Sequence, residues 1–166
     1  MTDLRIRPEQ PGDEASVRAV NEQAFGGAVE ADLVDRLRGD RDLVMSLVAA
    51  DDGVVGHAAF SRLRLPGASL RAVALAPVAV IPPYQRCGIG SALIQAGLER
   101  LRLAGEHLVL VLGEPAFYGR FGFTAEAAGP FSTPYDGPYL QALALSDPAA
   151  GAAGIVRYPP AFADIA

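Results

Sequence analysis

The chain has 166 residues, a mass of 17.3 kDa, a formal net charge of −5 at pH 7 and 51% hydrophobic residues. This length fits one ordinary domain, and we expect residues 1–166 to form a single domain with a core large enough to fold without disulfides. The acidic charge and the lack of a clustered basic face argue against nucleic acid as a partner, and the absence of lysine excludes a Walker-type phosphate site and Schiff-base chemistry.

The N-terminus and the cysteine content indicate the compartment. The first ten residues lack the apolar segment of a signal peptide, and the longest apolar stretch, 72–83, is too short and too proline-broken to span a bilayer. We therefore expect a soluble, cytoplasmic protein with no membrane partner. Cys87 is the single cysteine, so the chain can form no internal disulfide and no cysteine-rich metal site.

Strand and helix patterns alternate along the first half of the chain. Alternating apolar residues predict a strand over 3–8, and apolar residues on one face predict helices over 12–25 and 29–38. Two further strands lie within 42–65, joined by a turn at Asp51-Asp52-Gly53, a strong hairpin signal.

A strand, loop, helix and strand follow. We expect a long strand over 69–81, a helix from about Ser91 to Ala104, and a strand over 107–112 that is apolar enough to be buried on both faces. The connection is a right-handed crossover between parallel strands, which places the loop at the carboxyl end of a strand, where α/β folds bind ligands.

The loop itself, within VIPPYQRCGIGSALI (80–94), predicts a phosphate site. Gly88 and Gly90 allow the backbone to approach a ligand closely, and the helix that follows offers unpaired N–H groups and a positive dipole end. Arg86 can add a charged contact to a second phosphate oxygen. The alternative is a pair of glycines that only shape a tight turn.

Two common phosphate motifs do not match. The third glycine of a dinucleotide-binding fingerprint is replaced by Leu93, and a P-loop would need a lysine. A nucleotide-binding protein that uses the same loop for another phosphate ligand remains an alternative.

Gln85-Arg86-Cys87-Gly88-Ile89-Gly90, preceded by LAPVAVIPPY, resembles the acetyl-CoA-binding signature of the GNAT superfamily of N-acetyltransferases. FYGRFGF (117–123) is similar to a segment that follows the fifth strand in that superfamily, and YPPAF (158–162) is similar to the tail of small bacterial predicted acetyltransferases. The resemblance covers nearly the whole order of elements.

This resemblance implies an α/β fold of the GNAT type, an acyl-CoA N-acyltransferase fold with a central mixed, splayed sheet of six or seven strands flanked by helices. It also implies acetyl-CoA as co-substrate, no metal, and acetyl transfer to a primary amine by direct attack in a ternary complex. The acceptor would be a small molecule or a peptide, and the protein a monomer or homodimer. The alternative function is a catalytically silent CoA-binding or sensory module.

The resemblance also implies the binding residues. Backbone amides of the loop would wrap the pyrophosphate, and the end of the preceding strand would pair with the pantetheine arm as an added strand would. Pro77 lacks an N–H, which weakens sheet pairing and leaves backbone groups for a ligand. The implied residues are Gln85, Arg86, Cys87, Gly88, Ile89, Gly90 and Ser91 in the loop, and Val78, Ala79 and Val80 in the strand.

Catalysis requires a polarised acetyl carbonyl, a protonated leaving thiolate and a neutral amine. The backbone amide near Val80 is the expected oxyanion donor, and Tyr118 is the expected general acid, with a purely packing role as its alternative. The candidates for the general base are Glu30, Glu114, Asp136 and a water relay.

Other residues favour structural roles. Cys87 lies where the backbone binds the ligand, so we do not expect it to be a nucleophile. His57 and His107 lack the carboxylate pattern of a metal site. Within GPFSTPYDGPY (129–139), three aromatic residues either line the acceptor pocket or belong to a rigid surface loop; they are Phe131, Tyr135 and Tyr139.

Overall fold

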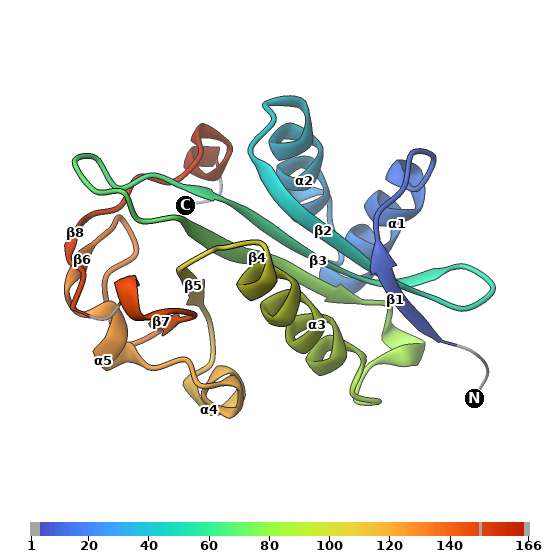
Figure 1. Ribbon diagram of the computed structural model, residues 1–166. Coiled ribbons are helices and arrows are strands. Elements are labelled where there is room, and N and C mark those ends of the chain that lie inside the picture. The colour runs from blue at the N-terminus through green and yellow to red at the C-terminus, as the bar shows by residue number, and fades with distance from the viewer. Residues whose placement is uncertain (1–3, 150, 165–166) are drawn as a thin grey trace. The chain divides into compact units, whose positions relative to one another are not determined.

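The computed structural model describes residues 4–149 and 151–164 of the chain (Figure 1). Within these residues, six strands form one mixed sheet in the order β1-β2-β3-β4-β5-β7, and β6 and β8 form a separate parallel pair. The strands are β1 (Arg5–Pro8), β2 (Leu43–Ala50), β3 (Val54–Leu63), β4 (Ala72–Val80), β5 (Leu108–Leu112), β6 (Phe131–Ser132), β7 (Leu140–Ala144) and β8 (Gly154–Ile155).

Helices alternate with these strands. The longer ones are α1 (Glu14–Phe25), α2 (Val29–Gly39) and α3 (Ile89–Leu103). The shorter ones are η1 (Pro82–Tyr84), α4 (Pro115–Tyr118), η2 (Gly119–Phe121), α5 (Ala125–Ala128), η3 (Asp147–Ala149) and η4 (Pro160–Asp164). No helix among the described residues is long and apolar enough to cross a membrane. Cytoplasmic location stays a prediction.

The described residues fall into two compact units. The first takes in 4–61, 77–97 and 159–164, and the second takes in 62–76, 98–149 and 151–158. Three elements, β3, β4 and α3, run from one unit into the other. The expectation of a single domain over 1–166 stays a prediction.

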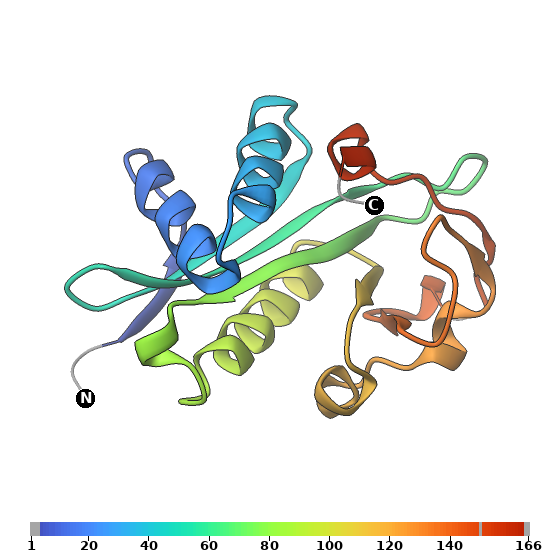
Figure 2. The same ribbon diagram turned by 180° about the vertical axis from the view of Figure 1, so that it is seen from behind.

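In the first unit, helices cover both faces of the strands (Figures 1 and 2). Val17 of α1, Val34 of α2 and Val48 of β2 form a buried cluster on one face. On the other face α3 packs closely, because a Cβ at Gly97 would overlap the ring of Phe60. The absence of a side chain at this one position therefore sets how near α3 comes to β3.

In the second unit, β5 lies between a parallel and an antiparallel neighbour. It pairs in parallel with β4 over 72–75 and in antiparallel with β7 over 140–144. Residues 108–111 are buried, as expected for an apolar strand covered on both faces, but Leu112 is 52% exposed. The prediction of complete burial is therefore wrong for the last residue of this strand.

Most expected elements are present, with shifted ends. The strand expected over 3–8 is β1 from Arg5, and Asp3 lies outside the described residues. The helix expected from Ser91 begins at Ile89, since the Ala92 N–H already donates to the Gly88 carbonyl at 3.0 Å. Glycine in a first helical turn costs little, because that turn lacks half of its backbone hydrogen bonds in any case.

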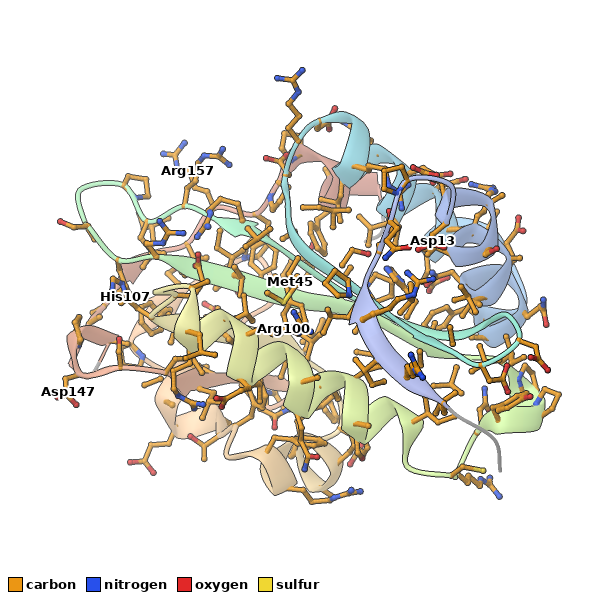
Figure 3. The ribbon with its side chains drawn as sticks, turned by 45° about the vertical axis from the view of Figure 1, so that its right-hand side comes forward. Asp13, Met45, Arg100, His107, Asp147 and Arg157 are labelled. Atoms are coloured by element: carbon orange, nitrogen blue, oxygen red, sulfur yellow. The ribbon has the colours of Figure 1, made fainter. Side chains whose placement is uncertain are left out.

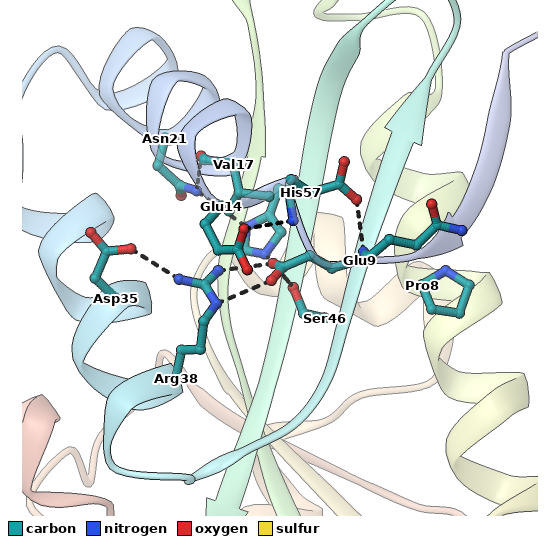
Figure 4. Close-up of polar contacts among 12 residues, drawn as sticks. Pro8, Glu9, Glu14, Val17, Asn21, Asp35, Arg38, Ser46 and His57 are labelled. Atoms are coloured by element: carbon teal, nitrogen blue, oxygen red, sulfur yellow. Dashed lines mark hydrogen bonds and ion pairs between the residues drawn. The ribbon is translucent and has the colours of Figure 1, made fainter.

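A buried histidine links three elements of the first unit (Figure 4). His57 of β3 is fully buried, with its Nδ1 3.1 Å from Asn21 Nδ2 and its Nε2 2.8 Å from Ser46 Oγ. Asn21 Nδ2 also donates to the Val17 carbonyl, so this nitrogen is the amide donor and His57 Nδ1 must accept. His57 is therefore the neutral tautomer that carries its proton on Nε2.

The hydrogen-bond chain continues to a charged pair. Ser46 Oγ donates to Glu9 Oε1 at 2.8 Å, and the Arg38 guanidinium donates to both carboxylate oxygens of Glu9 at 2.9 and 3.0 Å. Burial, and secondarily the positive charge of Arg38, lowers the pKa of His57 to about 3. Protonation would charge a fully buried group whose hydrogen-bond partners among the described residues, Asn21 and Ser46, are both neutral.

This network predicts acid sensitivity. The His57 side chain takes up a proton near pH 6.5 in the unfolded chain but only near pH 3 in the folded one, so the unfolded state binds more protons in between. The free energy of unfolding should fall as the pH drops through this window, by up to about 1.4 kcal/mol per pH unit from this group. Urea unfolding at pH 7, 6, 5 and 4 measures it.

The test variant is His57→Gln. It should be less stable at pH 7 and should lose less stability on acidification than the wild type. An unchanged pH slope in His57→Gln would contradict the assignment.

Candidate functional site

The carboxyl end of β4 extends past its partner. Pairing of β4 with β5 covers Ala72 to Leu75, and Pro77 follows soon after the last pair. The next residues are held by other contacts: the Ile81 N–H donates to the Val55 carbonyl at 3.0 Å, and Gln85 Nε2 donates to the Val80 carbonyl at 2.8 Å. The strand end is thus fixed in place without β5.

Two residues turn the backbone between this strand and α3. Arg86 has φ of +63° and Gly88 has φ of +84°, both in the left-handed region. That conformation costs a non-glycine residue such as Arg86 on the order of 1 kcal/mol or more, and such strain gathers at ligand-binding turns. Such turns form concave surfaces of backbone N–H groups that suit anions.

The loop has room for a ligand against its glycines. A Cβ at Gly88 would meet no atom within 4 Å, and one at Gly90 would only reach ordinary contact with Val78 and Val80 at 3.9 and 4.0 Å. Packing inside the chain therefore does not require glycine at position 90. A group that approaches the backbone from outside does require it, and a phosphate bound by the first N–H groups of α3 is such a group.

Cys87 and Arg86 lie on the outside of this loop. Cys87 is an exposed free thiol whose Sγ is 3.5 Å from the Gln85 carbonyl. No base contacts it among the described residues, and the expectation that it is not a nucleophile stays a prediction. The Arg86 side chain is exposed, and the backbone of the same residue has the left-handed conformation.

Tyr118, in the second unit, packs against a glycine at the end of β5. A Cβ at Gly113 would lie 2.5 Å from Cε2 of the Tyr118 ring, so only glycine lets the ring lie on this backbone. Phe117 and Phe123 meet the same ring edge to face, at 4.9 and 5.9 Å between centroids. The hydroxyl has no hydrogen-bond partner in the described part of the chain, and burial raises the pKa of Tyr118.

Gln141 supports this arrangement and has no signal in the sequence. Its Nε2 donates to the carbonyls of Gly113 and Tyr139 at 3.0 and 3.2 Å, while its buried Oε1 has no partner among the described residues. The side chain therefore fixes the peptide over which Tyr118 lies. Only the β5–β7 register, which sets Gln141 opposite Val111, brings it there.

The candidate bases have different surroundings. Glu30 is half-buried in the first turn of α2, and Glu114 is exposed at the start of α4. Asp136 is exposed and already accepts from the Thr133 N–H and hydroxyl at 2.8 and 3.1 Å, which closes a turn. None of the three is singled out as a base by its contacts.

The expected aromatic wall does not form one cluster by ring contacts. Phe131 is buried in β6, Tyr135 packs edge to face on Tyr158 at 4.9 Å, and Tyr139 is 55% exposed. The acceptor-pocket role of these residues stays a prediction. His107 accepts the Arg71 N–H, and the described residues hold no cluster of His, Cys, Asp or Glu suited to a metal.

Comparisons with known proteins identify the family of this chain. The family model of the acetyltransferase (GNAT) domain matches residues 5–125. The chain belongs to the GNAT family of acetyltransferases. The uncharacterized N-acetyltransferase YhbS of Escherichia coli is 37% identical over 160 residues, which cover 93% of this chain and 96% of that protein. YjhQ of the same organism, also an uncharacterized N-acetyltransferase, is 44% identical over 116 residues, 67% of this chain and 64% of YjhQ.

Solved structures of GNAT proteins share the fold. The crystal structure of E. coli YhbS in complex with CoA superposes with a TM-score of 0.90 at 35% identity and covers 98% of this chain and 96% of YhbS. A GNAT acetyltransferase from Brucella melitensis in complex with acetyl-CoA superposes with a TM-score of 0.82 at 38% identity, covering 96% and 98%. The expected GNAT fold is thus confirmed.

Gly113 offers a test of how Tyr118 is held. Gly113→Ala should push the Tyr118 ring away and destabilise the fold by about 1–3 kcal/mol, the usual cost of overpacking. Gly119→Ala is the matched control, because its Cβ would meet no atom within 4 Å and its φ of −57° suits alanine. Thermal unfolding and near-UV circular dichroism measure both; equal stability of the two variants would refute the contact.

Proposed function

We propose that this protein transfers an acetyl group from acetyl-CoA to the primary amine of a small molecule or a peptide, by direct attack in a ternary complex. The observation that carries the proposal is the turn before α3, where Arg86 and Gly88 adopt left-handed conformations and the Gly90 backbone is open to a ligand. The CoA and acetyl-CoA named for the two similar structures support it.

The loop and the strand end would hold the co-substrate. Backbone amides over Gln85–Ser91 would bind the pyrophosphate, with the Arg86 guanidinium as an added charged contact. Residues Val78–Val80, past the last β4–β5 pair, would offer main-chain groups to the pantetheine arm. Acetyl-CoA supplies an acyl group activated as a thioester, so no metal is part of the proposal.

Two residues would act on the reacting groups. The backbone N–H of Val80 would donate to the thioester carbonyl oxygen, where negative charge develops. Tyr118 would donate its hydroxyl proton to the departing thiolate. Its raised pKa keeps the phenol protonated at neutral pH, and its hydroxyl has no hydrogen-bond partner among the described residues that would compete for the proton.

The acceptor amine must lose a proton to become a nucleophile. A water relay is the route we favour, because Asp136 is committed to a turn and Glu114 is exposed. Glu30 remains the carboxylate to test next.

The decisive assay incubates the protein with acetyl-CoA and a panel of primary amines, with free thiol release as the readout. Turnover that depends on the amine supports the proposal. Tight binding of CoA without turnover of any amine would favour the catalytically silent module. If ATP or NAD, but not CoA, protects the protein against thermal unfolding, the nucleotide-binding alternative is favoured.

Gly90 tests the phosphate site. Gly90→Val places a branched side chain where the ligand would approach, so CoA affinity should fall about tenfold or more, as for loss of a charge-assisted contact. Gly39→Val, at the exposed end of α2 with no atom near its Cβ, is the control and should bind CoA as the wild type does. Calorimetry measures both. If a folded Gly90→Val protein binds CoA with wild-type affinity, the phosphate site does not lie at Gly90.

Tyr118 tests the acid. Tyr118→Phe keeps the ring and removes the proton, so stability and CoA affinity should hold while the maximal rate falls about 10²-fold or more. Tyr118→Ala should in addition lose about 3–5 kcal/mol of stability through the cavity left behind. Rate, CoA affinity and melting temperature are measured together for both variants. If Tyr118→Phe retains the wild-type rate of the chemical step, Tyr118 is a packing residue and not the general acid.

A further inference from the structure

A basic hollow lies in the second unit, and none of the residues assigned a role above lines it. It has a volume of about 670 Å³ and is formed by the end of β3, the β3–β4 turn, the start of β4 and Arg157. Four of its lining residues are arginines and none is acidic; the arginines are Arg62, Arg64, Arg71 and Arg157. On a chain with a net charge of −5, this concentration of positive charge needs an explanation.

A single buried carboxylate offsets part of this charge. Glu106, whose side chain is wholly buried, accepts two hydrogen bonds of 2.8 Å from Arg62 and two of 2.7 and 3.1 Å from Arg71. Arg62 is held further by the Ala72 carbonyl at 3.2 Å. One negative charge thus fixes two guanidinium groups in orientation and leaves a net positive charge.

Arg71 retains hydrogen-bonding capacity. Its Nε and Nη2 bind Glu106, whereas Nη1 has no partner among the described residues, and its side chain is 55% exposed. A guanidinium that is fixed on one edge and open on the other is preorganised for an oxyanion.

The other two arginines are brought together by the backbone. Arg64 and Arg157 exchange both main-chain hydrogen bonds, at 3.0 and 2.8 Å, as an isolated antiparallel bridge. Residues directly opposite in such a pair place their side chains on the same face, so this bridge sets Arg157 beside Arg64 in the lining of the hollow.

Apolar residues lie beside these charges. Of the apolar residues that line the same hollow, Pro66 and Ala68 are exposed and Leu70 is half-buried. A ligand that fits both features carries an anionic group and an apolar part. We propose that this hollow binds a small organic anion whose carboxylate or phosphate group contacts Arg71 and Arg157 and whose apolar part lies against Pro66 and Leu70. This site is independent of acetyl transfer.

The experiment titrates the ¹⁵N-labelled protein with phenyl phosphate and with benzoate and follows amide and arginine side-chain resonances by NMR. Benzyl alcohol is the neutral probe of similar shape. We expect saturable shifts at about millimolar concentration for at least one anion, as for a fragment-sized ligand, confined to residues 62–71 and 157. The tighter of the two anions identifies the head group as phosphate or carboxylate.

The matched variants are Arg157→Gln and Arg100→Gln. The Arg157 side chain makes no hydrogen bond or ion pair within the described residues, so its loss leaves the Glu106 contacts intact. Arg100 is also exposed but lies on α3, and Figure 3 shows it away from Arg157. Arg157→Gln should weaken anion binding about tenfold, and Arg100→Gln should leave it unchanged.

Three results would overturn the proposal. They are the absence of saturable shifts in the wild-type protein, equal shifts with benzyl alcohol, and anion-induced shifts centred on residues 85–91. The wild-type titration alone can return each of them, so the test does not depend on the folding of a variant.

Discussion

The strand-to-helix turn after β4 is the constraint on which the candidate site depends. Arg86 and Gly88 both take left-handed conformations, and this lets the chain turn from β4 into α3 over residues 81–88. If either residue reverted to a β or right-handed conformation, the first N–H groups of α3 would point elsewhere. The strain at Arg86 is offset by fixed ends: the Val80 carbonyl is bound by Gln85, and α3 packs closely on Phe60 at Gly97.

Because the chain contains no lysine, the carboxylates of Glu9 and Glu106 are paired with arginines. Glu9 is held by both arms of Arg38, and Glu106 by Arg62 and Arg71, each through paired N–H groups. A planar guanidinium satisfies two carboxylate oxygens at once, which compensates desolvation better than a single ammonium would. Removal of one partner would leave a buried carboxylate short of donors, at a typical cost of about 3–5 kcal/mol.

Local pattern was enough to predict much of the fold and one part of the site. The hairpin at Asp51-Asp52-Gly53, the helix after Gly90 and the apolar strand over 108–112 were all predictable, because turn chemistry and periodicity act over a few residues. Two glycines next to a helix start also predict a loop that binds a ligand through its backbone, and this role stays a proposal. The start of that helix was misjudged by two residues, because a glycine in the first helical turn is also typical of a loop.

Features that depend on register were not predictable. His57 was recognisable as a structural residue, but its contacts to Asn21 and Ser46 exist only because β2 and β3 pair with Val48 opposite His57 while α1 lies across them. Gln141 meets Gly113 only through the β5–β7 register. In each case residues far apart in the sequence are brought together by strand pairing.

The same dependence on register explains why charge counting missed the basic hollow. A net charge of −5 indicates no anion site. Three of the four arginines lie in 62–71, but two of these are bound to Glu106, and the fourth, Arg157, is brought to Arg64 by a single bridge. The sign of the local electrostatic potential depends on which arginines are paired with a carboxylate and which are not. The folded backbone, rather than the composition, decides this pairing.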